Sequence, residues 1–491
     1  MKLKHLFFDR RDHDLIKIVN SVYDADQRLK YIRKLYYPFF HPLGIKELAE
    51  TRGLRTAYAI VNLLESMERG TIENRLQALR GLKDEILNTA DGPMPKNTAR
   101  VLLQIMKELV RAKGDSHRQL QLAHAFRMAA SGKPRVTRGL LRHYHLLEMP
   151  EEWNQITFDD HVHDANTSGR KSPTHLIMDA WIKGIRRLRV IYYHAIEPRF
   201  AAELIEAAQV MEIDLRIGIE FQARFRDRYI SVIWVSRGLP DTEAFLCFLA
   251  EPHVVAFMEQ GKAVIRYQQA YVLHLLTAFN LKYLDTLNKN FQIQVAPLDP
   301  DEFLRFTVPG LASLSHLAEY IHLKSIRAMQ QRIEQISLNI DALAPEEQEK
   351  IRQQVEKMDQ FTTRDVLEHY LAPHLYPDLP DPFALTDTKN LPDRLTLDFV
   401  QLFEQLRQLH HDFRLTLKLG NLKPEDVLEI LYAGHGLVTR LEIINMKDFL
   451  AGKTTHMVSV NELKNAINAG SSLKLKRMVQ QIIIAAQQEG Y

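Results

Sequence analysis

The segment 158-FDDHVHDANTSGRKSP-173 begins as a strand, ends as a polar loop, and places two histidines two residues apart. Residues i and i+2 of a β-strand point to the same face. We therefore expect His161 and His163 to converge at the end of this strand, as two imidazoles do in many sites for first-row metals. The loop that follows carries two cations, Arg170 and Lys171, before Pro173.

Strands and helices alternate after this segment. Hydrophobic periodicity predicts strands at 156–163, 188–194, 214–221 and 228–235, and helices at 173–186 and 198–213. Strand–helix–strand units imply parallel strands joined by right-handed crossovers. Parallel sheets and barrels bind ligands at the carboxyl ends of their strands. Four potential metal ligands lie at or near these ends: His161, His163, His194 and Glu220.

The rest of the chain is predicted to be mostly helical. Residues 1–150 carry apolar residues at helical spacing almost throughout, so we expect a helical N-terminal domain there. Residues 311–372 are rich in Gln, Glu and Lys and predict a helical insertion. The strand-and-helix pattern returns at 398–445 and completes a predicted α/β domain at 151–450, and residues 451–491 are expected to form a helical tail.

The amino-acid composition indicates a globular protein and argues against several other classes. The chain has 491 residues, of which 46% are hydrophobic and 25% charged, which is typical of a globular protein with several domains. The formal charge of +3 does not call for nucleic acid or an anionic membrane as a partner. The single cysteine, Cys247, excludes an intrachain disulfide and a thiolate zinc cage. With no membrane-length apolar run and charge too early for a signal peptide, we expect a cytoplasmic protein.

The order of motifs over 158–221 resembles that of the polymerase and histidinol phosphatase (PHP) family. The motifs are 161-HVH-163, 168-SGRKSP-173, 193-YH-194 and 218-GIE-220. The resemblance implies a distorted (β/α)7 TIM-type barrel that holds divalent zinc, manganese or iron. It also implies hydrolysis of a phosphorylated small molecule or nucleotide. The implied metal ligands are His161, His163, His194 and Glu220.

In a PHP-type reaction, a metal-bound water attacks the phosphoester, because the metal lowers the pKa of that water to about 7. Arg170, Lys171 and Arg224 fall in loops at the same mouth and are predicted to bind the substrate phosphate. Lys418, on a predicted strand at 414–420, is a further candidate phosphate contact. Glu220 lies in an apolar strand, where a carboxylate needs a partner or a metal.

The sequence departs from the family pattern at two positions in these motifs. Tyr193 stands where the family has an acidic residue, and Gly169 follows Ser168 directly, without the family's aspartate. The family's later histidine motifs are not found in a matching frame. Two alternatives therefore stay open beside the phosphoesterase. One is a barrel whose metal site has decayed and which acts as a scaffold or regulator. The other is an amidohydrolase-like metal hydrolase, which also begins with His-x-His.

Overall fold

The computed structural model describes the chain except at residues 1–7, 24–51, 91, 168, 170, 238, 240–241, 308–310, 338–344, 380–381, 383–390, 421, 444–454 and 489–491. The chain divides into two compact units. Unit 1 comprises Met1–Val162, Lys171–Val190 and Arg199–Arg216, and unit 2 comprises His163–Arg170, Ile191–Pro198 and Ile217–Tyr491. The first strands and helices of the α/β region thus group with the N-terminal helices, and neither unit ends near residue 150. Independent folding of residues 1–150 stays a prediction.

The N-terminal part of unit 1 is helical, as predicted. Its helices are α1 (Arg10–Tyr23), α4 (Arg52–Arg69), α5 (Ile72–Thr89), α6 (Pro95–Arg111), α7 (Ser116–Ala130) and α8 (Pro134–His143). Thr71 caps α5 by accepting a hydrogen bond from the Asn74 amide, and Asp115 caps α7 in the same way. Helix α6 buries residues around most of its circumference, among them Leu102, Met106 and the charged Arg100, and it packs against α4, α7 and α8.

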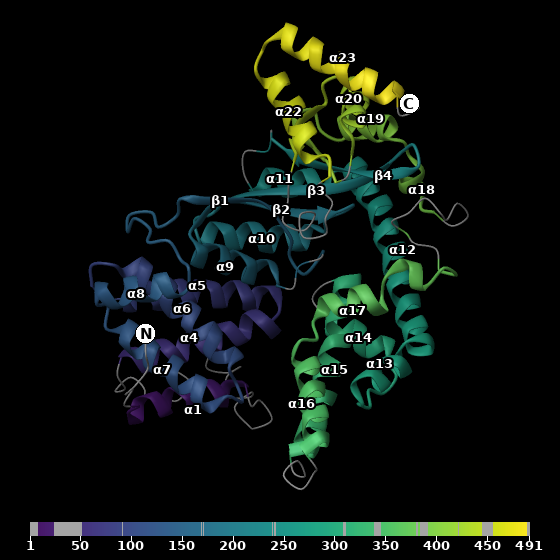
Figure 1. The fold of residues 1–491 in the computed structure, drawn as a ribbon. Helices are drawn as coiled ribbons and strands as arrows, with labels where there is room; N and C mark the ends of the chain where they lie inside the picture. Colours follow the sequence, from purple (N-terminus) through teal and green to yellow (C-terminus); the bar gives the residue numbers. More distant parts are fainter. Residues whose placement is uncertain are drawn as a thin grey trace. The chain divides into compact units, whose positions relative to one another are not determined.

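Unit 1 also contains the first strand–helix–strand segment, and the structure confirms the predicted parallel pairing there. Strand β1 (Thr157–Val162) pairs in parallel with β2 (Ile185–Tyr193), and α9 (Pro173–Lys183) joins them. Helix α9 begins at Ser172, whose side chain accepts from the His175 amide, and ends at Gly184, which adopts a left-handed conformation with φ of 75°. Helix α10 (Pro198–Val210) follows β2, and α9 packs on α5 and α6 (Figure 1).

Six strands of the described residues form one mixed sheet in the order β1-β2-β3-β4-β5-β6. The last four are β3 (Asp214–Phe225), β4 (Arg228–Ser236), β5 (Phe413–Lys418) and β6 (Val438–Glu442). Strands β3, β4 and β5 pair antiparallel, and β5 and β6 pair in parallel. The parallel pairing predicted for strand–helix–strand units does not extend to β3 and β4, because no helix lies between them. Only Arg226 and Asp227 join these two strands, and a parallel crossover needs a dozen residues or more.

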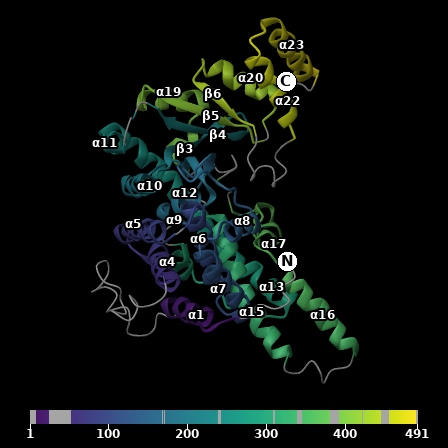
Figure 2. The same cartoon turned by 90° about the vertical axis from the view of Figure 1, so that its left-hand side faces the viewer.

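The middle of unit 2 is a helical body. Its helices are α11 (Thr242–Ala250), α12 (Pro252–Lys282), α13 (Leu284–Phe291), α14 (Pro300–Thr307), α15 (Leu314–Ser337), α16 (Pro345–Asp359) and α17 (Thr363–Tyr370), followed by the 3-10 turn η2 (Pro373–Leu375). One hydrophobic cluster runs through them from Tyr271 to Tyr376, with Leu275 and Leu317 fully buried. The body therefore begins well before residue 311, where the helical insertion was predicted to start. Figure 2 shows α15 and α16 beside each other, and they are in contact.

The C-terminal part of unit 2 returns to the sheet and ends in two helices. Its elements are α18 (Asp393–Thr396), α19 (Phe399–Leu409), α20 (Pro424–Ala433), α22 (Met457–Asn468) and α23 (Ser472–Gln488). Helix α20 joins the parallel strands β5 and β6, and both α22 and α23 pack against it (Figure 2). The described residues of the predicted tail thus form two helices that pack on the same chain, and a separate tail at 451–491 stays a prediction. No helix in the described part of the chain is long and apolar enough to cross a membrane.

Candidate functional site

Three of the four predicted metal ligands lie in unit 2, at or near the ends of neighbouring strands. His163 follows the last residue of β1, and His194 follows the last residue of β2. Glu220 lies within β3, and its carbonyl oxygen accepts a hydrogen bond of 2.9 Å from the His194 amide. His161 lies in β1 and belongs to unit 1. The sequence therefore predicted the strand-end positions of His163 and His194 correctly.

Both ring nitrogens of His163 contact other groups of unit 2. Nδ1 lies 2.8 Å from the carbonyl oxygen of Ile191, and because a carbonyl oxygen can only accept, Nδ1 carries the proton. Nε2 therefore accepts from the hydroxyl of Tyr193, at 3.2 Å, and the two rings lie 4.8 Å apart. Tyr193 stands where the PHP family has an acidic residue. Its hydroxyl is hydrogen-bonded to His163 Nε2, the nitrogen that would have to bind a metal ion.

Glu220 forms a buried ion pair with Lys418, which comes from β5. The Lys418 ammonium lies 3.0 and 3.2 Å from the two carboxylate oxygens. The two side chains are only 6% and 17% exposed. Burial lowers the pKa of Lys418, but the Glu220 carboxylate outweighs it, and the net pKa is raised above its ordinary value. The partner that the sequence required for Glu220 is therefore an ammonium group.

His194 is a buried, neutral imidazole. Burial lowers its pKa to about 3, and the positive charge of Arg394 adds to this, while a hydrogen bond with Gln222 acts in the opposite direction. Its Nδ1 is shielded from solvent and has no hydrogen-bond partner among the described residues. The backbone of His194 has a φ of 58°, in the left-handed region. Helix α12 comes so close to this turn that a Cβ on Gly261 would lie 2.0 Å from the His194 carbonyl oxygen.

Substitution of Gly261 by alanine tests this close approach. The added Cβ meets a backbone atom that cannot rotate away, so we expect a loss of about 1–3 kcal/mol in the free energy of unfolding. Gly139, in α8, is the matched control, because a Cβ there meets nothing within 4 Å. Gly139→Ala should stabilise the protein by about 0.5–1 kcal/mol through helix propensity alone. Urea denaturation of both variants measures the difference, and equal effects would contradict the packing of α12 on His194.

The loop after His163 is held by Asp164, which is fully buried. Its carboxylate accepts hydrogen bonds from the Tyr192 hydroxyl and from the amide and side chain of Asn166. Its carbonyl oxygen accepts from the amides of Thr167 and Gly169. These bonds fold the loop back on itself beside the end of β2. Asp164 is therefore a structural residue of the loop.

The three residues at the predicted mouth that were expected to bind the substrate phosphate belong to different parts of the chain. Arg170 lies outside the described residues. Lys171 forms an ion pair with Asp179, which also pairs with Lys107, and all three belong to unit 1. Arg224 lies in β3 of unit 2, where its amide donates to the carbonyl of Leu397. Phosphate binding by these residues stays a prediction.

No three His, Cys, Asp or Glu side chains in the described part of the chain lie close enough together to hold a metal ion. The structure thus does not assemble a metal centre from the predicted ligands His161, His163, His194 and Glu220. The contacts above give physical reasons, because Tyr193 holds His163 and Lys418 neutralises Glu220. Ligation of zinc, manganese or iron by these residues stays a prediction.

The Glu220–Lys418 pair is the main feature that the sequence analysis missed. Both residues interrupt apolar strand sequences, and this is the signal that could have paired them. Arg394 was missed as well. Its side chain is 1% exposed and its guanidinium carbon lies 3.6 Å from the centre of the Phe257 ring, so that an aromatic face compensates its charge. The sequence did not indicate that Arg394 would be buried, because this residue lies in a short polar segment.

Comparisons with known proteins add a distant structural likeness. No protein-family model matches the chain, and no curated protein matches it. One similar solved structure is a protein from Bifidobacterium adolescentis, provisionally assigned as a metal-dependent phosphoesterase, with 10% identity, a TM-score of 0.37, and coverage of 62% of this chain and 84% of that one. Another is an amidohydrolase from Chromobacterium violaceum with bound sulfate and no metal, with 12% identity, a TM-score of 0.38, and coverage of 63% and 84%. At these scores the likeness carries no argument about activity.

Proposed function

We propose that this chain is a non-catalytic member of the barrel hydrolase type that acts by binding, as a scaffold or regulator. The observation that supports this proposal is the Lys418 ammonium on both oxygens of Glu220. A buried carboxylate needs a compensating positive charge, and Lys418 supplies the charge that a metal ion supplies in a working metal site. The proposal corresponds to the decayed-site alternative that Tyr193 and the missing late motifs raised.

The geometry also argues against a cation at the same place. A divalent ion bound to the two Glu220 oxygens would lie within a few ångströms of the Lys418 ammonium, where like charges repel strongly in a buried environment. His163 would have to give up its hydrogen bond with Tyr193, and His194 is enclosed in the core. The residues present thus fit a metal ion poorly.

Metal analysis of the purified full-length chain tests this proposal. We expect no stoichiometric zinc, manganese or iron by elemental analysis, and no binding in calorimetric titrations with each ion. We also expect hydrolysis of p-nitrophenyl phosphate to be no faster than with the Glu220→Gln variant. Stoichiometric binding that Glu220→Gln or His163→Ala abolishes would refute the proposal.

A second candidate is the metal-dependent phosphoesterase that the motif order predicts. The hydrogen bond from His163 Nδ1–H to the Ile191 carbonyl favours this candidate, because it leaves Nε2 unprotonated, with a lone pair that could bind a metal ion. Metal-bound histidines are commonly oriented by such a bond. In this candidate, His163 and Glu220 would hold the ion after Tyr193 and Lys418 had moved away, and the ion would activate water and polarise the phosphoester. Metal-dependent turnover of p-nitrophenyl phosphate, lost in His163→Ala, would establish it.

A further inference from the structure

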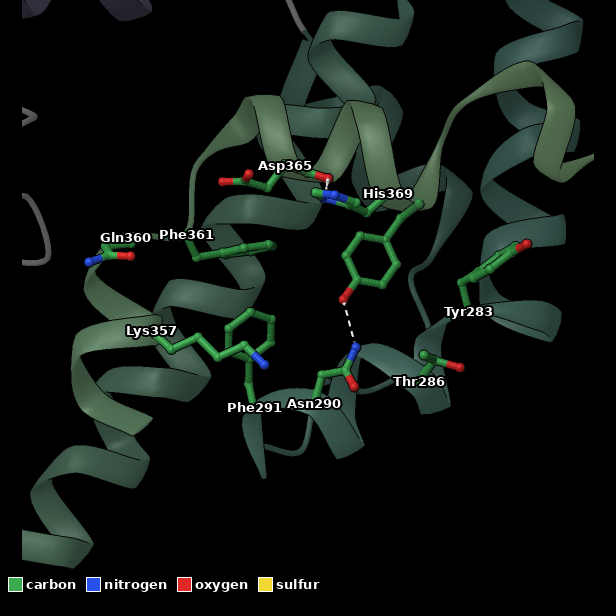
Figure 3. Close-up of a pocket in the computed structure, with 10 residues that line it drawn as sticks. Tyr283, Thr286, Asn290, Phe291, Lys357, Gln360, Phe361, Asp365 and His369 are labelled. Carbon is green, nitrogen blue, oxygen red and sulfur yellow. Dashed lines mark hydrogen bonds between the residues drawn. The ribbon is translucent and has the colours of Figure 1, made fainter. Parts of the chain in front are cut away.

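A cavity of about 470 Å³ lies in the helical body of unit 2, far along the chain from the predicted metal ligands. Its lining residues come from the Tyr283–Phe291 region, from the end of α16, and from α17 (Figure 3). Three rings in this lining, Phe291, Phe361 and Tyr370, are buried. Small-molecule sites of this size combine aromatic side chains with polar groups, and this lining has four aromatic and six polar or charged residues.

The aromatic side chains of the lining are held in place by contacts with one another and with neighbouring residues. The rings of Phe291 and Phe361 lie 4.7 Å apart, and the Phe361 carbonyl oxygen lies 3.0 Å from Nε2 of His322. Within the same lining, the Asn290 side chain donates to the Tyr370 hydroxyl at 3.2 Å. A ligand therefore meets rings that are already fixed, which reduces the entropy lost on binding.

The pocket lining carries one ammonium, Lys357, and one carboxylate, Asp365, and no ion pair joins the two among the described residues. Lys357 lies on the rim, its ammonium 5.6 Å from the centre of the Phe291 ring. The carboxylate of the lining, Asp365, is committed to the start of α17, where it accepts from the amide and the hydroxyl of Thr362 at 2.7 and 2.6 Å. These bonds lower the pKa of Asp365 and keep its charge at the helix terminus.

We propose that this cavity binds a planar aromatic molecule that carries one negative charge, such as an aromatic carboxylate. The ring of the ligand packs among Phe291, Phe361 and Tyr370, and its anionic group pairs with Lys357. Thr286 and Asn290 lie on the same lining and offer a hydroxyl and an amide oxygen to further polar groups. This inference goes beyond the proposed function, because no residue of the sheet takes part in it.

The test uses 2-naphthoate as the probe and 2-naphthylmethylammonium as its cationic counterpart, titrated by calorimetry against the full chain. We expect the anion to bind at least about tenfold more tightly than the cation. Lys357→Met should lower the affinity for naphthoate by about tenfold and remove the preference for the anion. Thr286→Trp, which fills the cavity from an exposed position on α13, should prevent binding of both probes.

Lys350→Met is the matched control, because Lys350 is an exposed lysine of the same helix α16 that does not line the cavity. It should bind naphthoate as the wild type does. The inference is overturned if the folded wild type binds neither probe, if it binds both equally, or if Lys357→Met and Thr286→Trp leave naphthoate binding unchanged. Circular dichroism of each variant verifies folding. None of these outcomes depends on metal binding, so this inference and the proposed function fail separately.

Discussion

Replacing Arg75 by methionine is expected to lower the free energy of unfolding by about 3–5 kcal/mol. Arg75 of α5 donates two hydrogen bonds, of 2.6 and 2.8 Å, to the carboxylate of Glu203 on α10. Glu203 is fully buried and also accepts from the Thr174 hydroxyl at 2.7 Å. Without the guanidinium, the Glu203 carboxylate stays buried and charged with the neutral Thr174 as its remaining partner among the described residues. A buried charge without a counter-charge lowers the stability of the folded protein.

The chain offers a control on the same two helices. Arg80 of α5 pairs with Glu206 of α10, but these side chains are 55% and 39% exposed. Arg80→Met should therefore cost less than about 1 kcal/mol. Because the chain has two compact units, unfolding in urea is best followed by hydrogen exchange of the α5 and α10 amides, which reports on unit 1 directly. Similar losses in the two variants would contradict the role assigned to burial.

Lys418→Met is expected to have an effect of the same size, about 3–5 kcal/mol, because it removes the ammonium that pairs with the buried Glu220 carboxylate. Glu220→Gln should also destabilise the protein, since it leaves the ammonium without its counter-charge. The double variant Lys418→Met/Glu220→Gln should lose less than the sum of the single losses, with a coupling energy of about 0.5–3 kcal/mol. Additive losses in urea denaturation would mean that the two charges do not stabilise each other.

The same pair predicts how stability changes with pH. The pKa of Lys418 in the folded protein is raised above the ordinary value of 10.5. The stabilisation is therefore fully present below the unfolded-state pKa and is lost as the pH rises through the folded-state pKa. Urea midpoints measured from about pH 9 to about pH 12 should fall more steeply for the wild type than for the double variant. Parallel curves would exclude a contribution from the Lys418 charge.

The local structure of the chain could be predicted from the sequence because it depends on short-range patterns. The helix after Pro173 and the apolar strand before His194 follow from a cap, a glycine stop and a run of β-branched and aromatic residues. The antiparallel direction of β3 and β4 is also encoded in the sequence, because only Arg226 and Asp227 lie between the two strands.

The candidate site around Glu220 could be predicted only in part, because its partner lies far away in the sequence. The sequence required a positive partner for Glu220 but could not choose between a metal ion and an ammonium group. That choice depends on Lys418, which is 198 residues away and reaches Glu220 from β5, with β4 between the two strands. The aromatic cavity had no signal at all, because Phe291, Phe361 and Tyr370 come from separate segments and are ordinary core residues in the sequence.

The division into two units has a consequence for synthesis of the protein. The chain passes between the units five times, after residues 162, 170, 190, 198 and 216. Arg75 precedes its partner Glu203 by 128 residues, an interval of roughly 6–26 s at a translation rate of about 5–20 residues per second. During that time the side of α5 that will pack on α9 and α10 is uncovered. Unit 1 is completed only when residue 216 has left the ribosome.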